Sequence, residues 1–158
     1  MKPDGDIYCA AHLKNAFYNR VENLDRAIRI LSTVEFCTIV CTGLSGALFA
    51  SPLSIIMGKQ LVVIRKEGDK NHSWSDNERN CSFGKVGPFI IVDDLIDTGA
   101  TVGRIKRKMS IVPFATHVGT YLYDNQGKFL PVTPEEIDAE RYVVESLTFI
   151  KTPSFFLP

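Results

Sequence analysis

The sequence predicts an α/β domain built on a doubly wound, mostly parallel sheet. Two observations lead to this fold class. Helical and strand patterns alternate along the chain, and the predicted strands are continuously apolar instead of alternating. Continuous apolar strands indicate a sheet that helices cover on both faces. Ligands of such sheets bind at the carboxyl ends of the strands.

The first predicted element is an amphipathic helix over about residues 12–33. Its apolar stripe, at spacings of three and four, consists of Leu13, Phe17, Val21, Leu24, Ile28 and Leu31. A short buried strand is predicted at 35–41. The apolar segment 47–57 is the next predicted helix, and Pro52 either lies near its first turn or kinks it. Gly58 is the predicted stop of that helix.

Three further strands and one helix complete the predicted core. The strands cover 61–64, 89–92 and 114–123, and the helix runs from Thr101 to about Met109. Residues 67–87 are polar and show little periodicity. This stretch is too long for an ordinary connection, which predicts a functional loop or lid.

We interpret residues 1–158 as a single domain. After the N-terminal helix, the core spans about 36–123 and a C-terminal segment spans about 124–158. In that segment Thr133 marks a helix start, because it precedes a proline and two glutamates. Residues 141–147 predict a late strand before an aromatic tail.

The composition bounds the partners and the compartment. The formal net charge is zero, with 18 basic and 18 acidic residues, which gives no global electrostatic reason to expect nucleic acid. No apolar run reaches the roughly 18 residues of a membrane helix, and the N-terminus lacks the apolar core of a signal peptide. The cysteines show no CxxC spacing; they are Cys9, Cys37, Cys41 and Cys81. Cys37 and Cys41 lie in an apolar run and are expected to be reduced core residues. We therefore expect a cytoplasmic, soluble protein that binds neither nucleic acid nor membrane.

Three polar segments follow predicted strands. They are Thr42–Gly46, Arg65–Lys66 and Asp93–Thr101. Because the carboxyl ends of parallel strands meet at one edge of a sheet, these segments converge on one rim. This convergence predicts a binding site.

The third segment contains an anion cradle, the stretch Asp97, Thr98, Gly99, Ala100 and Thr101. Backbone N–H groups of a turn between a strand and a helix point at one spot, and the helix N-terminus adds partial positive charge. Gly99 permits a tight turn, and the two threonines add hydroxyl donors. The stretch suits a phosphate monoester; the alternative is a plain turn with a threonine cap.

Asp93 and Asp94 end the preceding strand. Neighbouring side chains of an extended backbone point in opposite directions, and neither acid can be buried unpaired without cost. They suit ribose hydroxyls, contacted directly or through a magnesium ion held by oxygens. The alternative is a pair of solvated acids at a strand end.

The stretch 89–101, FIIVDDLIDTGAT, resembles the phosphoribosyl-pyrophosphate (PRPP) motif of the type I phosphoribosyltransferases. Segment 42–46 is similar to the pyrophosphate loop of that family. Segment 65–67 resembles the Arg-Lys pair of its orotate and adenine enzymes. The polar segment 67–87 stands where the family has its catalytic loop. The resemblance covers about 36–123.

This resemblance implies an enzyme, a magnesium-dependent transferase. It would move ribose 5-phosphate from PRPP to a nucleobase and release pyrophosphate. The implied catalytic residues are Asp93, Asp94 and Asp97, of which the first two would also hold the metal. Asp97–Thr101 would bind the 5-phosphate. The implied pyrophosphate site consists of Thr42, Gly43, Leu44, Ser45, Gly46, Arg65 and Lys66.

The identity of the base rests on fewer residues. Asp97 stands where 6-oxopurine transferases carry an aspartate and adenine enzymes tend to carry alanine, and PRPP synthetases share that aspartate. The 6-oxopurine enzymes also place a lysine late in the next strand. Here that strand offers Tyr121 and Tyr123, with Lys128 only after the turn. A purine is favoured.

The resemblance also implies a small variable hood, built from terminal residues, and a homodimer. The tail residues Phe149, Phe155 and Phe156 would stack on a base, or else serve as core or dimer contacts. A regulatory protein of the same fold, which binds PRPP or a nucleotide without catalysis, is the alternative function.

Overall fold

The computed structural model describes residues 20–65, 86–94, 96–123 and 126–136. In chain order the strands of its sheet are β1 (Thr38–Thr42), β2 (Gln60–Ile64), β3 (Pro88–Asp93), β4 (Thr116–Leu122) and β5 (Lys128–Pro131). The helices are α2 (Arg20–Leu31), α3 (Gly43–Met57) and α4 (Ala100–Met109). Within these residues, no helix is long and apolar enough to cross a membrane.

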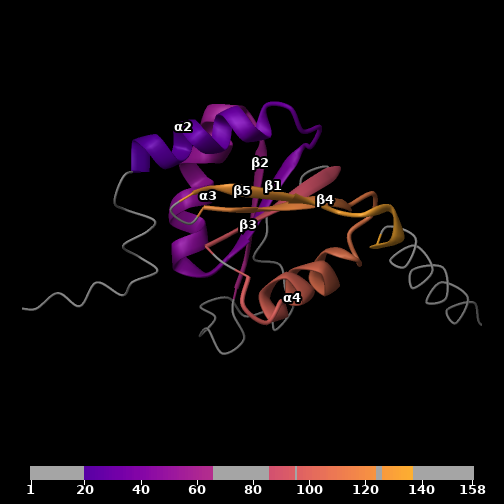
Figure 1. The fold of residues 1–158 in the computed structure, drawn as a ribbon. Coiled ribbons are helices and arrows are strands. Elements are labelled where there is room, and N and C mark those ends of the chain that lie inside the picture. Colours follow the sequence, from indigo (N-terminus) through magenta and orange to yellow (C-terminus); the bar gives the residue numbers. More distant parts are fainter. Residues whose placement is uncertain (1–19, 66–85, 95, 124–125, 137–158) are drawn as a thin grey trace, which may run out of the picture.

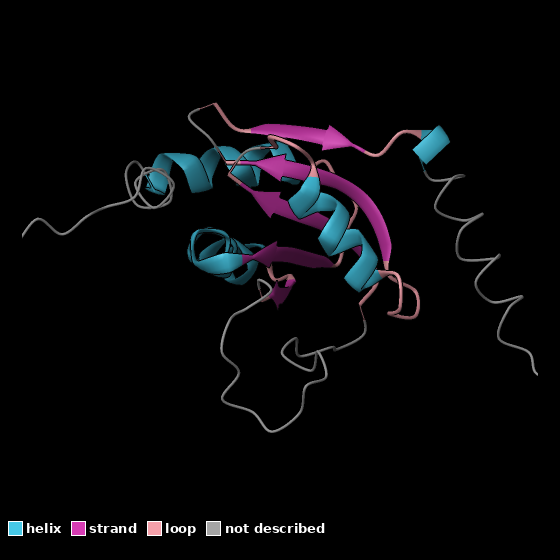
Figure 2. Cartoon of the chain, turned by 90° about the horizontal axis from the view of Figure 1, so that it is seen from below, coloured by secondary structure: helices cyan, strands magenta, loops and turns pink. Residues whose placement is uncertain are grey.

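The strands form one sheet in the order β2-β1-β3-β4-β5. All pairs are parallel except β4–β5, and Figure 2 shows the arrow of β5 pointing against its neighbours. Helices α2 and α3 lie on one side of the sheet and α4 lies on the other (Figure 1). The predicted doubly wound, mostly parallel α/β sheet is therefore confirmed.

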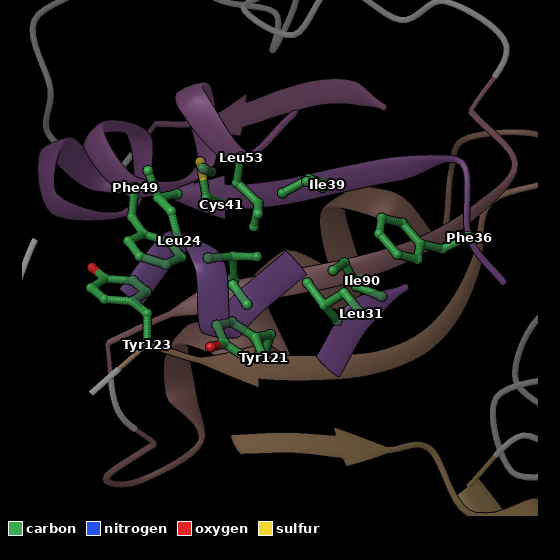
Figure 3. Close-up of a cluster of buried hydrophobic side chains, with 13 residues drawn as sticks. Leu24, Leu31, Phe36, Ile39, Cys41, Phe49, Leu53, Ile90, Tyr121 and Tyr123 are labelled. Atoms are coloured by element: carbon green, nitrogen blue, oxygen red, sulfur yellow. The ribbon is translucent and has the colours of Figure 1, made fainter. Parts of the chain in front are cut away.

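Two apolar clusters cover the two faces of the sheet. Ile39 and Cys41 of β1 pack into the cluster beneath α2 and α3, which Figure 3 shows. Val40, between them in the strand, packs with Ile105 and Met109 of α4. Successive side chains of a strand point to opposite faces, so both kinds of position must be apolar. This explains the continuous apolar strands of the sequence.

Helix α3 begins earlier than the sequence predicts. The expected loop at 42–46 is instead the end of β1 and the first turn of α3, which starts at Gly43 with a φ of 69°. Pro52 lies inside this helix, where it removes one backbone hydrogen bond. The helix continues through it because its inner face is packed on the sheet. Gly58 ends the helix in a left-handed conformation (φ 63°), as predicted.

A bulge and an additional strand distinguish the edge of the sheet. The register between β3 and β4 shifts after Phe89, which pairs with His117, while Ile90 pairs with Gly119. A Cβ at Gly119 would lie 2.6 Å from the carbonyl oxygen of Leu130 and 2.5 Å from the ring of Phe129. A glycine is therefore needed where β5 approaches. The sequence did not predict β5, a four-residue edge strand that ends in proline.

The C-terminal segment is described up to residue 136. The backbone N–H of Thr133 donates to Glu136 (3.0 Å), and the N–H of Glu136 donates to the Thr133 hydroxyl (3.4 Å). This reciprocal pair is a capping box, which confirms the predicted helix start. The predictions for 12–19, most of the loop at 67–87, the strand at 141–147, the hood and the aromatic tail lie outside the described residues.

Candidate functional site

The strand order creates a topological switch point between β1 and β3. The chain leaves β1 through α3 to reach β2 on one side, and it leaves β3 through α4 to reach β4 on the other side. Connections diverge at such a point and leave a crevice at the carboxyl ends of the strands, where ligands bind in open α/β sheets. The predicted phosphate and acid segments begin at this point, which brings them together as expected.

The two acids lie at the end of β3. Asp93 is the last residue of the strand, and the backbone N–H of Asp94 donates to its carboxylate at 3.0 Å. Both side chains are half-buried. Asp93 also pairs with Leu122 in β4, and its carbonyl oxygen accepts the N–H of Tyr123 at 3.0 Å. The backbone of the acid pair is thus fixed on the sheet, while its carboxylates remain accessible at the rim.

The anion cradle ends where α4 begins. Gly99 is the N-cap of α4, with φ 74° and ψ 0°, and no side chain caps this helix end. The hydroxyl of Thr98 accepts the N–H of Ala100 at 3.3 Å. Asp97 and Thr98 are exposed, and Gly99 and Thr101 are half-buried. The start of α4 is therefore accessible at the rim, where the helix dipole favours an anion.

The predicted pyrophosphate segment gives a second helix N-terminus at the same rim. Thr42 does not cap it, because its buried hydroxyl donates to the carbonyl oxygen of Ile64 at 2.7 Å and so ties β1 to β2. Gly46 is buried, and a Cβ there would lie 3.2 Å from that of Cys41. The Thr42 hydroxyl and Gly46 thus have packing roles that the sequence did not reveal. Gly43, Leu44 and Ser45 are partly or fully accessible.

Arg65 follows β2 directly and is exposed. Since Thr42 is level with Ile64 in the register of β1 and β2, Arg65 lies at the same rim, next to the start of α3. Lys66, the other predicted cation, lies outside the described residues. One of the two predicted basic residues is therefore placed at the rim.

Beneath the rim, the negative charge of the acid pair affects the pKa of two buried groups. Burial, with a smaller contribution from the charge of Asp93, raises the pKa of the Cys41 thiol to about 12. Burial also raises the pKa of Tyr123, with smaller contributions from Asp94 and Asp93. Both groups therefore stay protonated at neutral pH. Cys41 is a buried core residue, as predicted, whereas Cys37 is exposed and the prediction that it lies in the core is wrong.

Neither Tyr121 of β4 nor Tyr123, which follows β4, replaces the lysine that the sequence lacks. Tyr121 and Tyr123 are each 1% exposed and point into the cluster beneath α3, where both rings stack against Phe49. Lys128 is the first residue of β5 and is exposed. The residues that read a base therefore cannot be assigned to these tyrosines. The two tyrosines are spaced by two residues, as are the buried positions of an extended strand. This spacing is the sequence signal that predicts their burial.

The donor set of the rim suits magnesium held jointly with a ligand. Asp93 and Asp94 offer carboxylate oxygens, the ligand type that Mg²⁺ prefers. Within the described ranges, no group of three or more histidine, cysteine, aspartate or glutamate side chains is arranged to enclose a metal. An ion here would take its remaining ligands from water and from the phosphates of a substrate.

Comparisons with known proteins show which proteins this chain resembles. No family model matches the chain. It is 27% identical over 108 residues to the adenine phosphoribosyltransferase of Caldicellulosiruptor saccharolyticus, covering 61% of this chain and 60% of that protein. It is 30% identical over 95 residues to the adenine phosphoribosyltransferase of Malacoplasma penetrans, covering 52% and 55%. The chain therefore spans less than two thirds of these relatives.

Two solved structures resemble the sheet and its helices. The adenine phosphoribosyltransferase of Thermoanaerobacter pseudethanolicus has a TM-score of 0.51 at 19% identity, covering 64% of this chain and 65% of that one. That of Rhodothermus marinus has a TM-score of 0.50 at 17% identity, covering 63% of each chain. At these identities the likeness shows a shared fold.

Proposed function

We propose that this chain, which has the type I phosphoribosyltransferase fold and relatives of that family, transfers ribose 5-phosphate from PRPP to a purine and releases pyrophosphate. One observation carries the proposal. An acid pair, Asp93 and Asp94, lies at the switch point, and two uncapped helix N-termini begin at the same rim, at Gly43 and at Ala100. PRPP has the matching pattern, with a phosphate at each end of a neutral sugar.

The two helix ends would hold the two anionic ends of PRPP. The amides of Gly99–Thr101 and the hydroxyl of Thr101 would bind the 5-phosphate. The first turn of α3, with Arg65, would bind the pyrophosphate group. The α3 helix end is a fixed dipole that needs no reorientation when the leaving pyrophosphate gains charge, so it would stabilise the transition state more than the ground state.

Asp93 and Asp94 would face the sugar between those ends. Their carboxylates would accept hydrogen bonds from the ribose hydroxyls and favour the positive charge that develops on the ring as the bond to pyrophosphate breaks. Asp97, exposed at the start of the cradle, would sit nearest to the base. Magnesium, when bound by PRPP and the acid pair, would neutralise charge on the leaving group.

A purine is the acceptor that we expect. The relatives are named adenine phosphoribosyltransferases, which supports adenine. Asp97 is the residue that instead supports a 6-oxopurine. Because the buried tyrosines Tyr121 and Tyr123 do not reach a base at the rim, the choice between these purines rests on residues outside β4.

The burial of Tyr121 and Tyr123 also favours a second candidate function, because neither tyrosine reaches a base at the rim. This candidate is a regulator that binds PRPP or a nucleotide. Pyrophosphate release from PRPP and Mg²⁺ with adenine, hypoxanthine, guanine, xanthine and orotate separates the two functions. Turnover with a purine supports the transferase. PRPP binding without turnover across the panel supports the regulator, and failure to bind PRPP overturns both.

We also expect a homodimer. The outer face of α3 supports it, because Leu44, Ile55 and Ile56 are exposed there and the helix has no charged residue. Exposed apolar surface of this kind is typical of protein–protein contacts. The molar mass from light scattering on a size-exclusion column tests this expectation.

A further inference from the structure

The hydroxyl of Tyr123 is the least satisfied polar group near the rim. The side chain is 1% exposed, and the hydroxyl oxygen has no hydrogen-bond partner among the described residues. A buried hydroxyl without a partner costs about 1–3 kcal/mol, so such groups are rare in folded proteins. Phenylalanine would fill the same space without that cost. The physical reason for a tyrosine here is therefore a role of its hydroxyl in another state of the site.

The ring of Tyr123 is held in place by α3. It stacks on Phe49 at a centroid distance of 4.4 Å and an interplanar angle of 13°. Figure 3 shows the two side chains next to each other. The backbone N–H of the same tyrosine donates to Asp93. The position of the hydroxyl is therefore set by packing on one side and by the acid-bearing strand on the other.

Ser45 is the side chain that lies next to this hydroxyl. It stands four residues before Phe49 in α3 and so lies on the same helix face, one turn nearer the rim. Ser45 lowers the pKa of Tyr123, which places the two side chains close together, although the pair does not meet the geometry of a hydrogen bond.

We propose that Tyr123 is a positioning residue for the pyrophosphate end of the ligand, acting through Ser45. When the ligand binds, the Tyr123 hydroxyl donates to the Ser45 oxygen, and the Ser45 hydroxyl in turn donates to a pyrophosphate oxygen. A serine hydroxyl has one proton and two acceptor positions, so a donor from below directs that proton outward to the anion. Two hydrogen bonds in series also polarise each other.

The direction of this relay follows from the acceptor chemistry of pyrophosphate. Its deprotonated oxygens only accept hydrogen bonds, so the Ser45 hydroxyl must donate to them, and the Ser45 oxygen is left to accept from the Tyr123 hydroxyl. The relay leaves the 5-phosphate cradle at Gly99 untouched, because it reaches only the first turn of α3. The inference rests on the proposed function and adds to it the residue that orients Ser45.

Tyr123→Phe tests the relay, and Tyr121→Phe is its matched control. Both changes remove one hydroxyl from a 1% exposed tyrosine that stacks on Phe49, but Tyr121 lies within β4 and Tyr123 follows its last residue, so Tyr121 is two residues farther from the rim. Calorimetric titration with Mg²⁺–pyrophosphate, ribose 5-phosphate and PRPP gives three dissociation constants for each protein. Melting temperatures are measured in parallel.

We expect Tyr123→Phe to weaken pyrophosphate and PRPP about fivefold to tenfold, the loss of one hydrogen bond, and to leave ribose 5-phosphate unchanged. Its melting temperature should equal or exceed that of the wild type, since an unsatisfied hydroxyl is removed. Tyr121→Phe should leave all three affinities unchanged. In the double variant Ser45→Ala with Tyr123→Phe, the losses should not add, because both changes break one chain of bonds.

Equal pyrophosphate affinity in Tyr123→Phe and Tyr121→Phe overturns the inference alone. So does an equal loss for ribose 5-phosphate, or full additivity with Ser45→Ala. If the wild type binds none of the three ligands, the proposed function fails, and the inference fails with it.

Discussion

At the scale of single residues, the acid pair carries the most specific part of the proposed chemistry. Asp93 and Asp94 follow one another in sequence, and the sheet fixes their backbone through the pairing of Asp93 with β4. Their side chains are half-buried and lie at the rim. A ligand that binds at the rim would therefore meet their charge.

The double change Asp93→Asn with Asp94→Asn tests this role. We expect activity to fall by orders of magnitude, because amides neither hold magnesium well nor favour a positive charge on the sugar. The melting temperature should stay close to that of the wild type. A large drop in melting temperature would instead make the acids structural.

The matched control is Asp25→Asn. It removes an acid from the exposed face of α2, a helix outside the three segments that form the rim. Asp25 pairs with Arg29 at 3.0 Å, and both side chains are exposed, so its loss should cost only a few tenths of a kcal/mol. Activity of this control should remain at the wild-type level.

Cys41 provides a pH-dependent prediction. Its pKa is raised from 9.0 to about 12 in the fold, so the unfolded thiol ionises from about pH 9 while the buried thiol does not. The stabilising contribution is complete below pH 9 and is lost as the pH rises towards 12. By pH 11 the free energy of unfolding should have fallen by about 2–3 kcal/mol through this group.

Urea unfolding from pH 8 to pH 11, without added metal, measures this loss. Cys41→Ala should show a shallower decline than the wild type. Alkylation at pH 8, mapped by mass spectrometry, should modify the exposed Cys37 and spare Cys41. Identical pH slopes for the two proteins, or rapid alkylation of native Cys41, would contradict the burial of this thiol.

At the scale of elements, α4 depends on the backbone at its first residue. Gly99 has a φ of 74°, and a Cβ placed there meets no described atom within 4 Å. The left-handed backbone at this position penalises a branched residue even where there is room.

Gly99→Val should therefore weaken binding of ribose 5-phosphate and lower stability by about 1–2 kcal/mol, because the turn must change its backbone angles. Gly99→Asn should retain most of the affinity, since asparagine tolerates this conformation. Titration of ribose 5-phosphate into the two variants compares them directly. Wild-type affinity in the valine variant would show that the turn does not shape the cradle.

Strand β5 depends on Gly119 in a different way. A methyl group there would lie 2.6 Å from the Leu130 carbonyl oxygen, which belongs to backbone and cannot swing away. Gly119→Ala should lower the free energy of unfolding by about 1–3 kcal/mol, the usual cost of overpacking. Gly103→Ala, at an α4 position with room, should not. Equal melting temperatures of Gly119→Ala and the wild type would contradict the close approach of β5 to Gly119.

At the scale of the whole molecule, the sequence predicts the parallel core but not its edges. Strands β1 to β3 are continuous apolar runs, because helices cover both faces, and such runs are visible in a sequence. Strand β5 is four residues long and is stabilised by its pairing with β4, so its own residues carry little signal. The same holds for the bulge at Gly119, which depends on a neighbour in space.

The site divides in the same way. Asp93–Thr101 follows a strand and precedes a helix, and this local order predicts both the acids and the cradle. The start of α3 is not predicted, since two glycines in its first turn disfavour a helix, and packing on the sheet overrides that preference. The orientation of Tyr123 towards Ser45 depends on the stacking with Phe49, which no local pattern reveals.

The position of PRPP across two helix ends is the central claim, and amide chemical shifts measure it most directly. With Mg²⁺ present, PRPP should shift the amides of both Gly43–Gly46 and Gly99–Thr101. Pyrophosphate should shift mainly the first group, and ribose 5-phosphate mainly the second. Cys37 and Gly87, at the opposite ends of the strands, should stay unchanged. Shifts at that opposite edge, or the same group of amides responding to both half-ligands, would contradict the claim.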